Sequence, residues 1–274
     1  MTTLPAAEHD SYESIRHWLE KRCAIHYPDH KRDLLRQRLA RVQRAFNLPE
    51  LAELDRQVTK SQSHEVQLAV IHAASTNHTY FFRESEVLDF FRTHVLPDLK
   101  ARSEIRLWSA ACSTGDEVYT MAILIAETLG LGALKHTQIL GTDISAPVIE
   151  HAESGVFAAR HLEQLPPATR AKYMRAIGIE QFQILPEIRE ACTFRRMNLK
   201  TNPYPFKQRF QAVFCRNVLY YFAVPDQIEI LNALADVTED GGWLFTSVTE
   251  SVRDLTPRWT PVMSGVFRKA GGRA

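Results

Sequence analysis

The sequence is short of residues that build disulfide frameworks or metal sites. Its 274 residues contain four cysteines, which are scattered and form no C-x-x-C pair, and its eleven histidines form no H-E-x-x-H pattern. We therefore expect reduced thiols, as in a cytoplasmic protein, and no bound metal. The four cysteines are Cys23, Cys112, Cys192 and Cys215.

Long apolar runs and an excess of one charge sign are also missing. No stretch approaches the roughly 18 uninterrupted apolar residues of a membrane span. The first residues are polar, unlike those of a signal peptide. The net charge is +1, with 24% charged residues, so no global charge bias points to nucleic acid. We expect a cytoplasmic protein that neither inserts into membranes nor binds nucleic acid.

The fingerprint loops of phosphate-bearing cofactors are absent, and a looser turn stands in their place. Neither G-x-G-x-x-G nor G-x-x-x-x-G-K-[ST] occurs. Instead, small residues from Ala110 to Gly115 follow one apolar run and precede the acidic pair Asp116-Glu117, and a second run ends at Asp143. This order resembles a Rossmann-like sheet that holds an adenosine, with the last acid on the ribose. A loop with acids and no phosphate cradle suits S-adenosylmethionine, whose sulfonium is positive, although such a turn alone also fits any α/β protein.

The periodicity of apolar residues changes near residue 80. Before it, the spacing predicts helices throughout, including one that begins at Pro49 and one with an apolar stripe of Leu34, Leu35, Leu39 and Val42. After it, strands alternate with helices, which predicts a mostly parallel sheet covered on both faces. We expect helices over 116–129, 146–153 and 225–236, strands over 105–109, 138–142, 211–215, 243–248 and 262–268, and a turn at Gly241-Gly242. Pieces 181–185 and 191–195 predict a small antiparallel insert within 155–198.

Four further segments accompany the loop. Residues 76–84 read T-N-H-T-Y-F-F-R-E, residues 197–199 read M-N-L, residues 213–222 read V-F-C-R-N-V-L-Y-Y-F, and residues 240–246 read D-G-G-W-L-F-T. With them the chain closely resembles the chemotaxis receptor methyltransferases, the CheR family. The family motifs occur in order over almost the whole chain, with one residue fewer before Asn77, Asp116-Glu117-Val118 in place of E-E-P, and Tyr220 in place of an aliphatic residue.

The resemblance implies an S-adenosylmethionine-dependent protein-glutamate O-methyltransferase that forms methyl esters on chemoreceptors. It implies an α/β fold with a Rossmann-like class I methyltransferase sheet, an all-helical domain over 1–80, a catalytic domain over 81–274 and the β insert. It assigns Arg83 and Tyr221 to catalysis. The cofactor-binding residues that it implies are Asn77, Thr79, Arg83, Ala111, Glu117, Asp143, Asn198, Leu199, Arg216 and Asn217.

Little catalytic machinery is required for this chemistry. A glutamate carboxylate is ionised near pH 7, so its methylation needs no strong general base. Alignment of the two reactants can contribute on the order of 7–11 kcal/mol. We expect Arg83 and Tyr221 to steer the carboxylate.

The helical front implies a docking surface for the receptor. Between Lys31 and Arg44 stand six basic residues and one acid. Relatives use a basic helix here to dock on acidic receptor helices, which implicates Arg38, Arg41 and Arg44; a solvated polar face is the plainer alternative. Some relatives also grip a receptor C-terminal peptide through a G-x-G turn in the insert. Only Ile177-Gly178-Ile179 occurs here, so we expect no such tether, and we expect a monomer.

Two other classes remain open. One is a class I methyltransferase that acts on another substrate, and the other is a non-catalytic cofactor-binding scaffold. Intact Arg83, Glu117, Asp143, Asn217 and Tyr221 argue against the scaffold.

Overall fold

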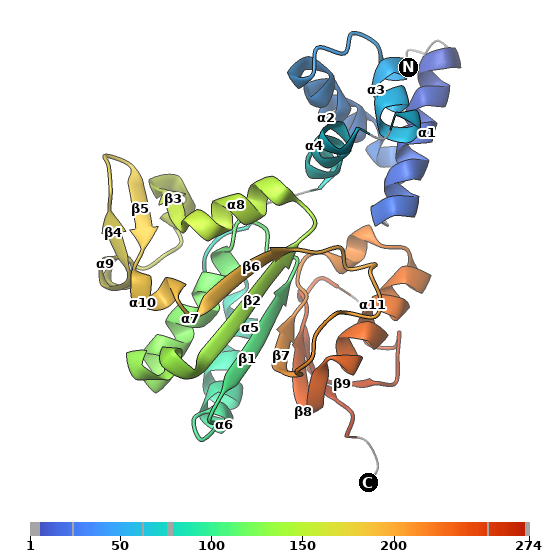
Figure 1. Cartoon of the computed structure of the whole chain (residues 1–274). Helices are drawn as coiled ribbons and strands as arrows, with labels where there is room; N and C mark the ends of the chain where they lie inside the picture. The colour runs from blue at the N-terminus through green and yellow to red at the C-terminus, as the bar shows by residue number, and fades with distance from the viewer. Residues whose placement is uncertain (1–5, 24, 62, 76–78, 251, 272–274) are drawn as a thin grey trace.

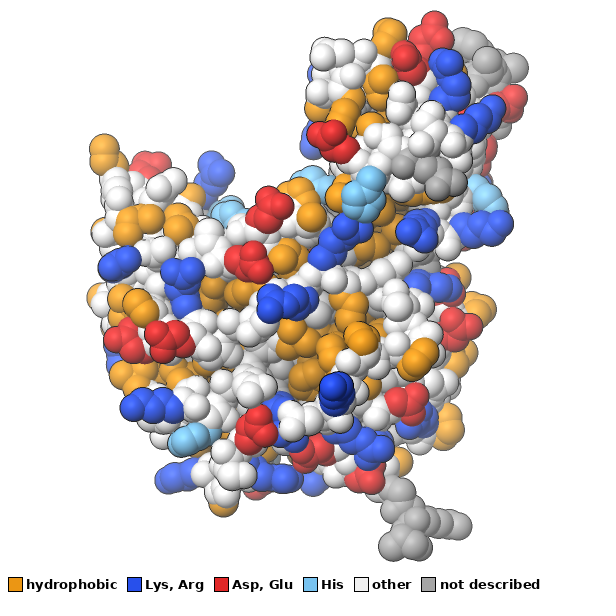
Figure 2. Space-filling view, in the orientation of Figure 1, with side chains coloured by type: hydrophobic (Ala, Val, Ile, Leu, Met, Phe, Trp, Pro, Cys, Tyr) orange, Lys and Arg blue, Asp and Glu red, His pale blue; other side chains and the backbone are white. Residues whose placement is uncertain are grey.

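The computed structural model describes residues 6–271 apart from 24, 62, 76–78 and 251. Figure 1 shows the N-terminal helices beside a larger α/β part, and the same two parts are visible in the space-filling view of Figure 2. The helices are α1 (Ala6–Cys23), α2 (Arg32–Ala45), α3 (Leu51–Asp55), α4 (His64–Ala74), α5 (Ser85–Phe90), α6 (Leu96–Leu99), α7 (Asp116–Leu129), α8 (Ala146–Ser154), α9 (Pro167–Tyr173), α10 (Pro186–Arg189) and α11 (Val224–Asp236). The strands are β1 (Ile105–Ala110), β2 (Thr137–Asp143), β3 (Val156–Ala158), β4 (Met174–Ala176), β5 (Gln181–Ile184), β6 (Cys192–Arg196), β7 (Phe210–Phe214), β8 (Thr238–Phe245), β9 (Trp259–Met263) and β10 (Val266–Lys269). Short 3-10 or π segments cover Asp29–Lys31, Arg56–Lys60, Phe91–Val95, Leu131–His136, Ala159–Leu162 and Leu219–Tyr221.

Helices α1 to α4 enclose an apolar core of their own. Leu19, Leu35 and Leu39 are fully buried there. Leu34, predicted to belong to the same apolar stripe, is 41% exposed, because three leucines in so short a span cannot all face one side of a helix. The helix predicted to begin at Pro49 starts two residues later, at Leu51. The boundary at residue 80 itself stays a prediction.

The larger part is built on one twisted sheet. Among the described residues its strand order is β6-β2-β1-β7-β8-β10-β9, with β6, β2, β1, β7 and β8 parallel and β10 antiparallel to both of its neighbours. This is the predicted mostly parallel, Rossmann-like sheet. The chain order reverses between β1 and β7, and ligands of open α/β sheets bind at such a point, beyond the carboxyl ends of the strands.

Alternating side chains place apolar residues on both faces of the sheet. Along β7, Ala212 and Phe214 pack towards α5, α6 and α7, whereas Val213 packs towards α11. The period of two is that of a strand, and burial on both faces is typical of parallel sheets. Trp108 and Phe81 are both fully buried, whereas Phe82 is partly buried.

Three sequence-based expectations in this part are wrong. The predicted insert does contain a three-stranded antiparallel sheet, β3-β5-β4, but β6 pairs in parallel with β2 and belongs to the main sheet. Gly241-Gly242 lies within β8, where the register with β7 shifts, instead of forming a turn before the strand. The single strand predicted over 262–268 is the hairpin β9–β10, because Gly265 adopts φ +74° between them.

Hydrogen bonds between described residues join the helices α1 to α4 and the segments between them to the α/β part. The backbone N–H of His26 donates to the Tyr221 carbonyl at 3.0 Å, and Asn198 Nδ2 donates to the Arg22 carbonyl at 3.0 Å. His72 Nδ1 lies 2.7 Å from Ser145 Oγ. In the described part of the chain no helix combines the length and apolarity that crossing a membrane would take.

Candidate active site

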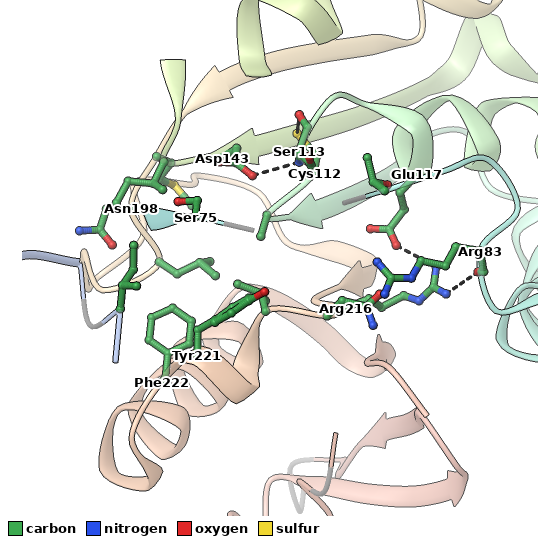
Figure 3. Close-up of a pocket in the computed structure, with 18 of the residues that line it drawn as sticks. Ser75, Arg83, Cys112, Ser113, Glu117, Asp143, Asn198, Arg216, Tyr221 and Phe222 are labelled. Carbon is green, nitrogen blue, oxygen red and sulfur yellow. Dashed lines mark hydrogen bonds and ion pairs between the residues drawn. The ribbon is translucent and has the colours of Figure 1, made fainter. Parts of the chain in front are cut away.

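A pocket opens where the chain order of the sheet reverses. It holds about 1060 Å³ counted out to its open mouth. Its walls come from the ends of β1, β2 and β7, the start of α7, and the residues Cys23, Ile25, Ala74, Ser75, Thr79, Tyr80, Arg83 and Leu88. Its lining is largely apolar, with polar groups at both ends (Figure 3), as is typical of small-molecule sites.

The structure brings together ten of the predicted site residues. The lining includes Thr79, Arg83, Ala111, Glu117, Asp143, Asn198, Leu199, Arg216, Asn217 and Tyr221. Asn77 lies outside the described residues. The predicted docking residues stand elsewhere, on α2, where Arg41 and Arg44 are exposed. Arg38 points inwards instead, since its Nη1 donates to Tyr27 Oη at 2.7 Å and to the Ala74 carbonyl at 2.8 Å.

Strained backbone is concentrated around this pocket. Of the six described non-glycine residues with positive φ, five lie here, and Asn47 is the exception. The five are Phe82 (58°), Glu84 (56°), Ala111 (79°), Ser113 (50°) and Asn217 (59°). Such conformations cost of order 1–3 kcal/mol each and persist only where the surroundings dictate them, most often at functional sites.

Gly115 serves packing more than ligand approach. It adopts φ +89° before α7, and an added Cβ would lie 2.9 Å from Ala152 Cβ and 3.2 Å from the Phe194 ring. The small-residue turn therefore allows α7 to lie against α8 and β6. The residues of the turn that line the pocket are Ala111, Cys112 and Ser113.

Asp143 stands at one end of the pocket, at the carboxyl end of β2 (Figure 3). Its Oδ2 accepts the Ser113 N–H and its Oδ1 accepts the Ser145 N–H, both at 3.0 Å. Burial raises the pKa of the carboxyl, although these N–H groups favour its ionised form. A carboxylate has about four lone-pair sites, so it can also accept from two neighbouring hydroxyls.

A buried ion pair marks the other end. Arg216 Nη1 donates to Glu117 Oε2 at 2.9 Å, and Glu117 Oε1 accepts from Ser109 Oγ at 2.7 Å. The Arg216 side chain is only 3% exposed, and its Nε finds no partner in the described residues. A buried guanidinium N–H without an acceptor is costly, so this end suits a ligand that carries a negative group. Asp116, beside Glu117 in sequence, is not part of the lining, and its carboxylate is buried with Thr114 Oγ1 at 2.6 Å.

The two predicted catalytic residues lie on different walls of the pocket. Arg83 lies at the same end as the Glu117–Arg216 pair, and Tyr221 lies opposite Cys112 and Ser113 (Figure 3). Arg83 stands over the Tyr80 ring at 5.7 Å, and the Arg83 carbonyl accepts from Arg216 Nη2. Tyr221 ends the short segment Leu219–Tyr221, and its hydroxyl points into the pocket in Figure 3. Tyr220 Oη donates to Tyr221 Oη at 3.3 Å.

Two carboxylates that the sequence analysis did not single out bind residues of the site without lining the pocket. Glu84 Oε1 accepts from Asn217 Nδ2 at 3.1 Å, and Glu84 Oε2 lies 3.3 Å from Arg216 Nη2. Glu250 accepts the backbone N–H groups of three successive residues, Asn217, Val218 and Leu219, at 3.1, 2.9 and 2.7 Å. Glu84 ends the motif of residues 76–84, and Glu250 follows the motif of residues 240–246. Their hydrogen-bond partners, however, come close only in the folded chain.

Comparison with known proteins agrees with this geometry. Residues 77–266 match the family model of the CheR methyltransferase SAM-binding domain, and residues 10–70 match the CheR methyltransferase all-alpha domain. The chain belongs to the CheR methyltransferase family. It therefore carries an S-adenosylmethionine-binding domain of the CheR type behind an all-α CheR domain.

Three relatives are similar to this CheR chain over most of its length. A chemotaxis protein methyltransferase of Vibrio parahaemolyticus is 32% identical over 266 residues, which cover 96% of both chains. One of Escherichia coli is 32% identical over 263 residues, 95% of this chain and 91% of the relative. One of Borreliella burgdorferi is 30% identical over 236 residues, 84% and 83% of the two chains.

The CheR pocket fits S-adenosylmethionine at both ends. Asp143 offers acceptors for a ribose diol, and apolar Ile144, Met197 and Leu199 lie nearby in the wall. At the other end, the positive charge of the Arg216 guanidinium suits the carboxylate of the amino-acid part, and the negative charge of Glu117 suits its ammonium.

Proposed function

We propose that this CheR chain transfers the methyl group of S-adenosylmethionine to glutamate carboxylates in the cytoplasmic domains of bacterial chemoreceptors. The product is a glutamate methyl ester, which adjusts receptor output. The observation that carries the proposal is one pocket with an acceptor carboxylate, Asp143, at one end and the Glu117–Arg216 pair at the other, with Arg83 and Tyr221 beside it. The relatives are named chemotaxis protein methyltransferases, which supports a substrate in chemotaxis.

The residues supply position more than acid–base chemistry. When bound, S-adenosylmethionine supplies a methyl group that is already activated by its sulfonium. Asp143 binds the ribose, Glu117 and Asn217 accept from the ammonium, and Arg216 donates to the cofactor carboxylate. Thr79, Ala111, Asn198 and Leu199 shape the wall.

Arg83 and Tyr221 orient the substrate carboxylate. An Arg–carboxylate pair is geometrically specific, but it also stabilises the nucleophile before reaction. Arg83 must therefore hold the carboxylate without neutralising it fully, and the Tyr221 hydroxyl is a weaker donor that adds direction. No general base is required, since the glutamate is ionised at neutral pH.

The α2 helix presents the docking face. Arg41 and Arg44 are exposed and border a shallow groove with Gln37 and Leu48. Acidic receptor helices complement these charges. Arg38 is left out of this face, because its guanidinium is held by Tyr27 and the Ala74 carbonyl. The enzyme acts as a monomer and does not depend on a C-terminal receptor peptide.

The test is transfer of labelled methyl from S-adenosylmethionine to chemoreceptor-bearing membranes, followed by mild alkali. We expect label in a receptor-sized band that base releases as methanol, the signature of a carboxyl ester. Receptors with glutamine at the methylated positions serve as the control and should take up no label. Base-stable label, or none on a panel of receptors despite cofactor binding, would contradict the proposal.

A further inference from the structure

Glu84 occupies an unusual position for a charged residue. It stands at the start of α5 with φ 56°, and its side chain is only 16% exposed. A left-handed conformation is unfavourable for glutamate, so the contacts of the side chain must compensate for it. Those contacts run to residues 216–217 and 247–248, far away in the sequence.

Among the described residues, the Glu84 carboxylate contacts donors at both of its oxygens. Oε1 accepts from Asn217 Nδ2 at 3.1 Å and from Ser247 Oγ at 2.8 Å. Oε2 lies 3.3 Å from the Val248 N–H and 3.3 Å from Arg216 Nη2. Burial alone would raise the pKa of Glu84, but the bonds from Asn217 and Ser247 and the charge of Arg216 lower it below its ordinary value. The group is thus an ionised, acceptor-only carboxylate at neutral pH.

An acceptor-only partner fixes which way an amide faces. A carboxylate cannot donate to Asn217 Oδ1, so the amide must turn its Nδ2 to Glu84. Its Oδ1 accepts from none of the described residues and remains for the pocket, which Asn217 lines. The backbone of Asn217 is fixed separately, because Glu250 accepts its N–H. The side chain therefore directs Nδ2 to Glu84 and leaves Oδ1 as its acceptor for a ligand.

We propose that Glu84 is a positioning residue that makes Asn217 an acceptor for the ammonium of S-adenosylmethionine and, together with Glu117, holds Arg216 towards its carboxylate. This inference rests on the proposed function only for the identity of the cofactor. Glu84 itself does not line the pocket and acts through its two neighbours. It makes recognition of the amino-acid part of the cofactor depend on a residue that does not touch it.

Calorimetry with two ligands tests this without any receptor. S-adenosylhomocysteine carries the amino-acid part, whereas 5′-methylthioadenosine lacks it. Glu84→Gln should weaken S-adenosylhomocysteine about tenfold or more, because a bond to a charged group is lost or reversed, and should leave 5′-methylthioadenosine unchanged. Glu86→Gln on the exposed face of α5 is the matched control and should change neither.

A second substitution separates position from general damage. In Glu84→Gln/Asn217→Asp the donor and acceptor are exchanged, so the new carboxylate accepts from the new amide and still offers an oxygen to the pocket. This double variant should recover much of the affinity for S-adenosylhomocysteine. Equal weakening of both ligands by Glu84→Gln, no weakening at all, or no recovery in the double variant would overturn the proposal. Because the readout is binding, failure here is distinguishable from failure of methyl transfer to receptors.

Discussion

Single residues divide into those that hold the cofactor pocket in shape and those that face the substrate. Glu84, Glu117 and Glu250 each accept from at least two donors within the protein, so they fix the positions of the pocket residues that they bind. Arg83 and Tyr221 line the pocket through groups that can meet an incoming carboxylate. This division predicts different kinetic effects for the two sets.

Arg83→Ala and Tyr221→Phe should reduce turnover and leave cofactor affinity nearly intact. A hydrogen bond to a charged group contributes about 1.5–3 kcal/mol, which corresponds to a loss in kcat of roughly 10- to 100-fold for each. Methyl transfer at saturating cofactor gives the rate, and calorimetry with S-adenosylhomocysteine gives the affinity. Tyr220→Phe is the neighbouring control and should have the smaller effect, since it removes only the donor to Tyr221. Unchanged rates for both Arg83→Ala and Tyr221→Phe would disprove the assignment.

Elements were predictable where local pattern and position in the sheet agree. The range of α7 was predicted to the residue, because Gly115 precedes it and Gly130 follows it. The bulge at Gly241-Gly242 was mistaken for a turn, since a glycine pair is compatible with both and only the register with β7 distinguishes them. β6 was placed in the wrong sheet for a similar reason. The sequence of β6 fits a strand, but it does not show which strand is its neighbour, and in the folded chain that neighbour is β2.

The functional site divides in the same way. Residues within recognisable motifs, such as Asp143 and Arg216, were predicted and do line the pocket. Glu84 and Glu250 were missed as functional residues, because their partners come from segments that meet only in the folded chain. Arg38 was given a docking role because it belongs to the basic helix that relatives use for docking. That pattern does not show that Tyr27, which lies outside the helix, binds the Arg38 guanidinium.

At the scale of an element, α2 should govern receptor affinity and its salt dependence. Arg41→Glu/Arg44→Glu should raise the KM for receptor about tenfold at low ionic strength, because it reverses charges that attract an acidic partner. The difference from wild type should shrink as salt increases. Lys135→Glu/Arg160→Glu makes the same charge change at exposed positions outside the pocket and the α2 groove, and should leave the KM unaltered. An equal effect of both double variants would mean that net charge, not the α2 face, attracts the receptor.

For the whole molecule, the contact between the helical front and the sheet should depend on pH. Burial lowers the pKa of His72, whose Nδ1 meets Ser145 Oγ between α4 and α8. With the folded pKa below the unfolded value of about 6.5, the unfolded chain binds more protons as the pH falls, so acidification through that range reduces stability. His72→Gln should make the loss between pH 7.5 and 5.5 shallower, as measured by urea unfolding at each pH. His151 also has a pKa lowered by burial, so part of the loss should remain. An identical slope in the variant would refute the role of His72.

The bond between the His26 N–H and the Tyr221 carbonyl constrains how chimaeric enzymes can be built. Cys23 and Ile25, close to this bond in sequence, form part of the wall around the cofactor. Grafting all of α1 to α4 from a relative would replace that part of the pocket wall together with the proposed docking face on α2. A graft limited to residues 32–60 carries α2 and α3, and it should keep the native Arg38, whose guanidinium holds Tyr27 and the Ala74 carbonyl. Such a graft would exchange the exposed face of α2 while residues 22–23, 25–27 and 74–75 stay native.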